Sequence, residues 1–345
     1  MSHSESLNGV VPQQYTGAFA IPFGKRVKFY IDNHRISTFT TCPRLFEYTQ
    51  IDNWRPKSTG QALSIGAWWS RVLELTYREM SFGTLPTLEQ CSKFAADAWI
   101  EMQMDTALPE RALNRFGGKE GALLMIMQYY NNYLERDFQN WKIIGTEVGF
   151  GLKDEVVVGE DDEVIVCLTG KPDFIVYEYG LGQVVIGDHK TVDYVKGNTL
   201  ISYKPHPQTA GYVYAAQQIA KSLNIDARST TDRCIISISA RMKPSEKPRD
   251  GKPKPRFIRA YPNYTQAEID EWRSELMQKC RELKSALTSK TFIKHENSCH
   301  IYGGCSFRRV CSVPPGARPI ILKADFRQVD AWVPYDPEES TDSDD

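Results

Sequence analysis

The sequence predicts an α/β fold in which helices flank a mixed central β-sheet, with a helical block before the sheet and a cysteine-rich segment after it. Apolar residues recur at three- and four-residue steps up to about residue 140, which is the spacing of amphipathic helices. Short β-branched runs follow, and helix and strand patterns then alternate. The 345 residues, 41% hydrophobic and 25% charged, suffice for one large or two modest domains with a substantial core.

The first 140 residues divide into an arm and a helical region. Residues 1–25 are polar and weakly patterned, which predicts a flexible arm. The region 26–140 is predicted to be helical, because amphipathic periodicity begins near Ser37 and turn signals separate its later segments. The expected helices cover residues 63–78, 87–104 and 119–138.

The region 141–262 is predicted to contain the central sheet. Three β-branched runs predict three or four hairpin-linked strands, at residues 142–152, 163–178 and 183–192. The segments 154–163 and 178–183 are the expected turns between them. A helix over 206–221 and a further strand over 233–241 complete this region.

The remaining residues predict a long helix, a cysteine-rich segment and an acidic tail. In the region 263–325, Thr265 and Glu268 fit a capping box that opens a helix running to about residue 288. Residues 326–345 are the acidic tail, with six acidic and no basic residues from 334 onward, and we expect this tail to be disordered.

The sequence does not suggest a membrane or secreted protein. No apolar run reaches the roughly 18–20 residues that span a bilayer. The first residues, MSHSESLNGVVPQQ, lack the basic and then apolar layout of a signal peptide. We therefore expect a reducing cytoplasm, where clustered cysteines bind metal more often than they form disulfides.

Two carboxylates followed by a lysine are the strongest candidates for chemistry. Asp173 begins one predicted strand and Asp188 lies near the end of the next, so antiparallel pairing would bring them together. Lys190 faces the same side of its strand as Asp188, whereas His189 faces the other side. Two carboxylates hold Mg²⁺ or Mn²⁺ while leaving positions for water and phosphate, and a nearby lysine orients the water. Because D-x-K alone is common in solvated turns, the adjacent strands are what favour catalysis.

The motifs around these residues resemble a known nuclease family. GKPDFIV, GDHK and QTAGY are similar to motifs II and III and the Q-x-x-x-Y motif of the RecB-like branch of the PD-(D/E)XK nucleases, which have a restriction-endonuclease-like core. The resemblance implies that Asp173 and Asp188 bind the catalytic metal and that Lys190 assists the water. It also implies that Gln208 and Tyr212, at i and i+4 on one helix face, brace the active site or contact DNA.

One position departs from the family pattern. The family has G-x-x-x-H followed by a glutamate, and GAWWSRVLE is the matching stretch. Gly66 and Glu74 fit, but Ser70 stands where the resemblance implies a metal-binding histidine. Serine is a poor substitute, so either water fills the position or another group, such as Glu74 or Glu147, takes its place. Glu74 is therefore a candidate catalytic residue, with a solvated helix face as the alternative.

Four of the eight cysteines form a second constellation. Cys299, Cys305 and Cys311 follow one another with five residues between each pair, a spacing that suits a metal better than a hydrophobic core. With Cys42 in TTCPRLFEY, they resemble the iron–sulfur staple of AddB-type nuclease domains and of the CRISPR-associated RecB-like exonucleases. The resemblance implies a structural [4Fe–4S] cluster, with zinc as the alternative. The other four cysteines are expected to be core residues.

Contacts with DNA are expected from the basic stretch between residues 241 and 259, with a solvated charged loop as the alternative. The candidate residues there are Arg241, Lys243, Lys252, Lys254 and Arg256. Aromatic residues on the predicted helices, such as Trp68 and Trp69, could stack on bases, but core packing is the favoured interpretation.

These features predict a deoxyribonuclease that hydrolyses phosphodiesters with Mg²⁺ or Mn²⁺. The resemblance implies exonuclease action on single-stranded or end-processed DNA in recombination, repair or phage DNA metabolism, beside a single-strand-annealing or recombination protein, in a bacterial or phage-infected cell. Two alternatives stay open: an inactive iron–sulfur scaffold that binds DNA, which Ser70 favours, and a nuclease subunit that works only inside a larger complex. The sequence does not indicate an oligomeric state.

Overall fold

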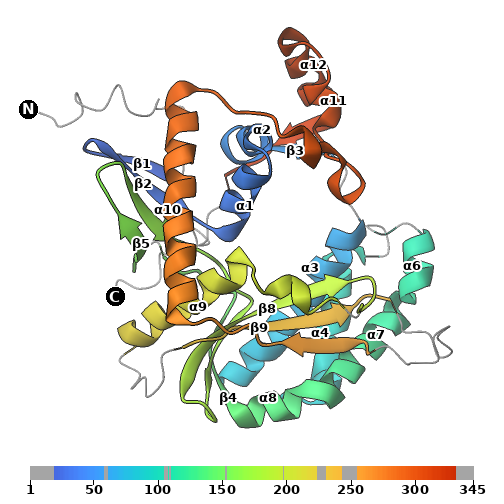
Figure 1. Cartoon of the computed structure of the whole chain (residues 1–345). Coiled ribbons are helices and arrows are strands. Elements are labelled where there is room, and N and C mark those ends of the chain that lie inside the picture. Colours follow the sequence, from blue (N-terminus) through green and yellow to red (C-terminus); the bar gives the residue numbers. More distant parts are fainter. Residues whose placement is uncertain are drawn as a thin grey trace, which may run out of the picture. The chain divides into compact units, whose positions relative to one another are not determined.

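The computed structural model describes residues 19–57, 61–104, 108, 110–151, 154–196, 198–223, 231–242 and 255–331. They form two compact units, each assembled from segments that are distant in the sequence (Figure 1). The first unit contains the described residues within 1–58, 149–171 and 270–345, and the second unit those within 59–148 and 172–269. The units therefore do not follow the order of the regions along the chain.

The second unit is built around a five-stranded mixed sheet, which confirms the predicted α/β fold (Figure 1). Its strands lie in the order β10 (Phe257–Ala260), β9 (Ile235–Ala240), β8 (Gln183–Val192), β7 (Phe174–Glu178) and β4 (Trp141–Thr146). β8 and β9 are parallel, and the other neighbouring strands are antiparallel. The parallel pair needs a crossover, which the helix over residues 207–222 provides.

Helices cover both faces of this sheet. They are α3 (Gln61–Ser81), α4 (Leu88–Glu101), α6 (Glu110–Phe116), α7 (Gly118–Tyr129), α8 (Glu135–Asn140) and α9 (Pro207–Ser222). Asp188 of β8 contacts α9 through Tyr212, while the next residue, His189, stacks on Tyr77 of α3. Because successive side chains of a strand point to opposite faces, α3 and α9 lie on opposite sides of the sheet.

The helices largely follow the sequence pattern. Thr87 caps α4 through a capping box with Gln90, and α3 and α9 match their predicted ranges closely. The predicted helix over 119–138 is instead α7 and α8 joined by a π-helical turn at Tyr130–Leu134. Trp68, Trp69 and Tyr129 are fully buried, so the aromatic residues at helical spacing are core, as favoured.

The first unit contains two smaller sheets. Its four-stranded sheet has the order β1 (Ala20–Phe23), β2 (Arg26–Ile31), β6 (Val164–Leu168) and β5 (Val156–Glu160), and β3 (Trp54–Pro56) pairs with β11 (Phe326–Gln328). The helices of this unit are α1 (Asn33–Thr41), α2 (Pro43–Phe46), α11 (Arg308–Cys311) and α12 (Arg318–Asp325). α10 (Gln266–Ser289) begins in the second unit and continues in the first.

Several strand predictions were wrong. Residues 20–31, predicted as an arm and the start of a helical region, form β1 and β2, whose segment RVKFYI alternates buried and half-buried side chains. β5 lies in the predicted turn 154–163, because its valines bury alternate side chains despite the flanking acids. β6 pairs with β2 and β5 instead of joining β7 in one sheet.

The ends of the chain are described only in part. The predicted arm is described from residue 19, and residues 1–18 lie outside the described residues. Of the predicted acidic tail, Phe326–Gln328 form strand β11 and are not disordered, while residues 332–345 lie outside the description. Among the described residues, no helix is both long and apolar enough to cross a membrane.

Candidate active site and cysteine cavity

The pairing of β7 with β8 brings Asp173 and Asp188 together. Phe174 lies opposite Gly187 in the antiparallel register, so Asp173, one residue earlier, lies opposite Asp188. The backbone N–H of His189 donates a hydrogen bond to Oδ2 of Asp173. A Cβ atom at Gly187 would lie 1.9 Å from the ring of Phe174, so glycine is what permits this close pairing.

Asp188 is the centre of a hydrogen-bonded chain that reaches α9. Its side chain is buried, and Oδ1 accepts a hydrogen bond of 3.1 Å from the hydroxyl of Tyr212. That hydroxyl accepts a bond of 3.0 Å from Nε2 of Gln208, one helical turn earlier. Lys190 forms an ion pair with Oδ2 of Asp188. The structure thus brings together five of the six residues predicted for the active site: Asp173, Asp188, Lys190, Gln208 and Tyr212.

The electrostatics of the site favour a bound cation. Burial raises the pKa of Asp173 well above its usual value, and the nearby charges of Asp188 and Glu147 raise it further. The His189 N–H and Lys190 oppose this effect only partly. Two adjacent carboxylates resist being ionised together, and a divalent cation between them would remove that repulsion.

The oxygen atoms present also fit such a cation. Oδ2 of Asp188 is buried, and the ammonium group of Lys190 lies beside it. Carboxylate oxygen is the ligand that Mg²⁺ and Mn²⁺ prefer, with water and phosphate in the remaining positions. Burial lowers the pKa of Lys190, but the charge and hydrogen bond of Asp188, together with the charge of Asp173, raise it on balance, so Lys190 is charged at neutral pH.

Ser70 lies at this site, at the position where a histidine was expected. Its hydroxyl donates a hydrogen bond of 3.3 Å to Oδ1 of Asp173. α3 approaches β8 closely here, since a Cβ atom at Gly66 would lie 3.0 Å from Oγ1 of Thr191. The glycine of the G-x-x-x-S segment therefore allows the helix to reach the strand, and the serine contacts the carboxylate.

Glu74 does not join the other predicted residues. One of its carboxylate oxygens lies 2.9 Å from Nη1 of Arg71, and the other forms an ion pair with Arg78. Both arginines lie on α3, three residues before and four residues after Glu74, and their charges neutralise its carboxylate. The contacts of Glu74 therefore lie on its own helix and not with the two aspartates, and its catalytic role stays a prediction.

Two neighbours of the site escaped the sequence reasoning. The pKa of Tyr203 is raised mainly by burial and that of His206 is lowered mainly by burial, and both respond to Lys190 and Asp188. Nδ1 of His206 accepts a hydrogen bond from the backbone N–H of Gln208 and so caps α9. Tyr203 and His206 could have been found from the sequence, because they lie just before the Q-x-x-x-Y motif of a helix whose motif residues face Asp188.

The basic stretch only partly fits the expected DNA contacts. Lys243, Lys252 and Lys254 lie outside the described residues. Arg241 pairs with Asp193 at 2.8 Å, and its side chain is 12% exposed. Arg256 is 7% exposed and donates to the Gln128 side chain, and burial lowers its pKa to about 10. The prediction that Arg256 contacts phosphate is therefore corrected: it packs inside the second unit.

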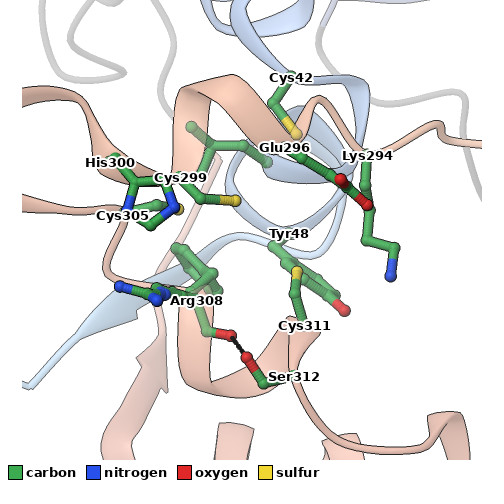
Figure 2. Close-up of a pocket in the computed structure, with 12 residues that line it drawn as sticks. Cys42, Tyr48, Lys294, Glu296, Cys299, His300, Cys305, Arg308, Cys311 and Ser312 are labelled. Atoms are coloured by element: carbon green, nitrogen blue, oxygen red, sulfur yellow. Dashed lines mark hydrogen bonds between the residues drawn. The ribbon is translucent and has the colours of Figure 1, made fainter.

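The four cysteines of the second constellation line one cavity in the first unit (Figure 2). The cavity has a volume of about 280 Å³. Figure 2 shows the sulfur atoms of Cys42, Cys299 and Cys311 pointing toward one another, with Cys305 beside them. Cys42 lies between α1 and α2, and the backbone N–H of His295 donates to its sulfur at 3.5 Å.

Packing within the first unit positions this cavity. Tyr48, from the π-helical turn after α2, stacks on Phe307 at 5.2 Å, and Phe307 stacks on Phe326 of β11 at 4.3 Å. Burial raises the pKa of the Cys305 and Cys311 thiols. Among the described residues, no group of three or more His, Cys, Asp or Glu side chains is arranged to hold a single metal ion.

The remaining cysteines are core residues, as expected. Cys91, Cys167, Cys234 and Cys280 are fully buried. Burial raises the pKa of Cys91 and of Cys167 to about 11, so both thiols stay protonated at neutral pH.

Comparison with known families agrees with this geometry. The model of the PD-(D/E)XK nuclease superfamily matches residues 34–312, which include both aspartates, Lys190 and all four cavity cysteines. No curated protein sequence matches the chain significantly. Since the match covers most of the chain and members of this superfamily are metal-dependent nucleases, the chain belongs to the PD-(D/E)XK nuclease superfamily.

Proposed function

We propose that the protein is a RecB-like deoxyribonuclease that degrades single-stranded or end-processed DNA as an exonuclease, with Mg²⁺ or Mn²⁺ at Asp173 and Asp188. The observation that carries this proposal is the convergence of Asp173, Asp188 and Lys190 on paired strands within the matched family region. A site of two carboxylates and one ammonium suits phosphodiester hydrolysis, because it binds a cation and a phosphate together.

In this proposal each side chain has a separate task. Asp173 and Asp188 would hold the ion, which when bound polarises the scissile phosphate and lowers the pKa of its water. Lys190 stabilises the negative charge that develops on the phosphate. Tyr212 holds the orientation of Asp188 through its hydroxyl, and Gln208 fixes Tyr212 in turn. Burial raises the pKa of Tyr212 well above its usual value, so its hydroxyl keeps the proton that it donates to Asp188.

The cysteine cavity supports an iron–sulfur cluster as the second cofactor. Cys42, Cys299, Cys305 and Cys311 would hold a [4Fe–4S] cluster, which when bound supplies a cross-link between distant chain segments. Thiols spaced around a cavity of about 280 Å³ suit a group of several atoms. A single zinc ion would need the cysteine sulfurs at about 2.3 Å from one point. Because no group of three or more such side chains among the described residues is arranged in that way, zinc is the less favoured alternative.

The biological setting follows the family resemblance. A nuclease of this kind suits recombination, repair or phage DNA metabolism, alongside a single-strand-annealing or recombination protein. Ser70 favours one other candidate, a catalytically inactive scaffold that binds DNA, because a hydroxyl provides less to a metal ion than an imidazole. A nuclease subunit that works only inside a larger complex is a further alternative, and a partner pull-down separates it from the stand-alone enzyme.

The test is cleavage of end-labelled single- and double-stranded DNA by anaerobically purified protein with Mg²⁺ or Mn²⁺. We expect metal-dependent degradation that falls more than about a hundredfold in Asp188→Ala and in Lys190→Ala. Asp193→Asn is the matched control, since this exposed carboxylate lies one residue past the same strand. Cleavage that survives in Asp188→Ala, or none with either metal in the wild type, overturns the proposal.

A further inference from the structure

The structure distinguishes between the two acidic residues that the sequence offered as replacements for the missing histidine. Glu74 is held by Arg71 and Arg78 on its own helix. Glu147 instead follows the last residue of β4, which is paired with β7. Its backbone N–H donates a hydrogen bond of 3.1 Å to the carbonyl of Asp173, so Glu147 is anchored directly beside one of the two aspartates.

The end of β4 is shaped in a way that turns Glu147 out of the regular strand. The register between β4 and β7 shifts between Ile143 and Gly145, which marks a β-bulge. A Cβ atom at Gly145 would lie 2.6 Å from the side chain of Val148, so the chain folds tightly around this point. Bulges of this kind redirect side chains and occur often beside active sites.

Glu147 itself has a backbone conformation that glutamate rarely adopts. Its φ angle is +54°, in the left-handed region that normally favours glycine or asparagine. Such conformations persist only where the surrounding structure enforces them, and they gather at functional sites. Together, the bulge, the left-handed conformation and the backbone hydrogen bond place Glu147 next to Asp173.

We propose that Glu147 is an outer-sphere carboxylate of the divalent cation site, where it accepts hydrogen bonds from the hydration shell of the ion held by Asp173 and Asp188. This inference rests on the proposed function. An outer-sphere role agrees with the absence, among described residues, of three acidic groups close enough to hold one ion directly. It also suits Mg²⁺, which retains several of its waters in protein sites.

Glu147 would then add negative charge to a site in which Ser70 is neutral. Ser70 contacts the metal-binding carboxylate as a neutral hydrogen-bond donor, at 3.3 Å from Asp173. Asp173 and Asp188 share the positive charge of Lys190, which forms an ion pair with Asp188. A further carboxylate beside Asp173 raises the attraction for a divalent cation without any group on α3 having to bind it.

The test is Mn²⁺ affinity of the full-length protein, measured by isothermal titration calorimetry without DNA. Glu147→Gln removes the charge at nearly constant size, and we expect its Mn²⁺ dissociation constant to rise about tenfold or more. Asp193→Asn, which changes the exposed carboxylate one residue past β8, is the matched control and should bind Mn²⁺ as the wild type does. Glu147→Asp, which keeps the charge at the same backbone position, should bind more tightly than Glu147→Gln.

Each outcome separates this inference from the proposed function. Unchanged Mn²⁺ affinity in Glu147→Gln, or equal weakening in the Gln and Asp variants, overturns the role of Glu147 even if the wild type cleaves DNA. A wild type that binds Mn²⁺ and never cleaves DNA overturns the nuclease proposal, while the weakened binding of Glu147→Gln would still support the inference. Thermal unfolding of each variant, followed by circular dichroism, serves as the control that every variant is folded when its Mn²⁺ affinity is measured.

Discussion

The hydroxyl of Ser70 lies 3.3 Å from Oδ1 of Asp173, so a neutral donor on α3 contacts the carboxylate that the superfamily pattern assigns to metal binding. A histidine at this position would offer a nitrogen ligand to a metal ion, whereas the serine hydroxyl donates a hydrogen bond to the carboxylate. In the second unit, α3 thus contacts the candidate site through a neutral hydroxyl. The predictions below follow from this arrangement and from the buried groups around it.

Ser70→Ala should reduce DNA cleavage only modestly, by roughly twofold to tenfold, because one hydrogen bond contributes about 0.5–1.5 kcal/mol. The measurement is kcat/KM for degradation of labelled DNA in the presence of Mn²⁺. A loss as large as that in Asp188→Ala would instead mean that Ser70 takes a direct part in metal binding or chemistry.

Tyr212→Phe should weaken Mn²⁺ binding by about tenfold to a hundredfold, as is typical for removal of a group that orients a metal ligand. The hydroxyl of Tyr212 lies 3.1 Å from Asp188 and 3.0 Å from Nε2 of Gln208, so its loss frees the aspartate to rotate. Calorimetric titration with Mn²⁺ checks this expectation. Tyr214→Phe, on a different face of α9, serves as the control.

Cys42→Ser should abolish the cluster proposed for the cavity in the first unit. Anaerobically purified wild type should contain about four iron atoms per chain together with acid-labile sulfide, whereas the variant should contain neither and melt at lower temperature. Cys91→Ser is the control for a buried thiol away from the cavity. If the wild-type protein carries one zinc and no iron, the cluster is contradicted and the zinc site is supported.

His189→Phe should remove a pH dependence of stability on the acidic side. Burial, together with the charges of Arg259 and Lys190, lowers the pKa of His189 from 6.5 to about 3. The folded state therefore keeps this imidazole neutral while the unfolded state protonates below pH 6.5, so stability is lost as the pH falls toward 3.

The slope of this loss should reach up to about 1.4 kcal/mol per pH unit for the wild type. Urea unfolding at several pH values measures it, and the difference from His189→Phe isolates the histidine, because the raised pKa of Asp173 acts equally in both proteins. Parallel pH profiles for the two proteins would contradict the prediction. Phenylalanine keeps an aromatic ring in contact with those of Phe174 and Tyr77.

Asp137→Asn should destabilise the second unit by about 3–5 kcal/mol, as expected when one partner of a buried ion pair is removed. Asp137 and Arg259 are 1% and 3% exposed, and the hydroxyl of Tyr77 also donates to Asp137. The free energy of unfolding in urea gives the measurement. Glu160→Gln breaks the more exposed pair with Arg26, and we expect a change of about 1 kcal/mol or less.

The sequence by itself determined the α/β class, most helices and the composition of the candidate site. Amphipathic spacing and capping pairs are local signals, and they located α3, α4, α9 and α10 closely. The proximity of Asp173 and Asp188 was also predictable, since a short turn joins β7 to β8 and antiparallel pairing then sets their register.

The tertiary structure alone decided which distant groups surround these residues. Whether Glu74 or Glu147 lies beside Asp173 depends on ion pairs along α3 and on a bulge in β4, and neither leaves a periodic signal in the sequence. The assignment of β6 to the first unit likewise depends on its parallel pairing with β2, more than 130 residues earlier. Charge and hydrophobic patterns fix what a segment can bury, but only the packed chain selects its partners.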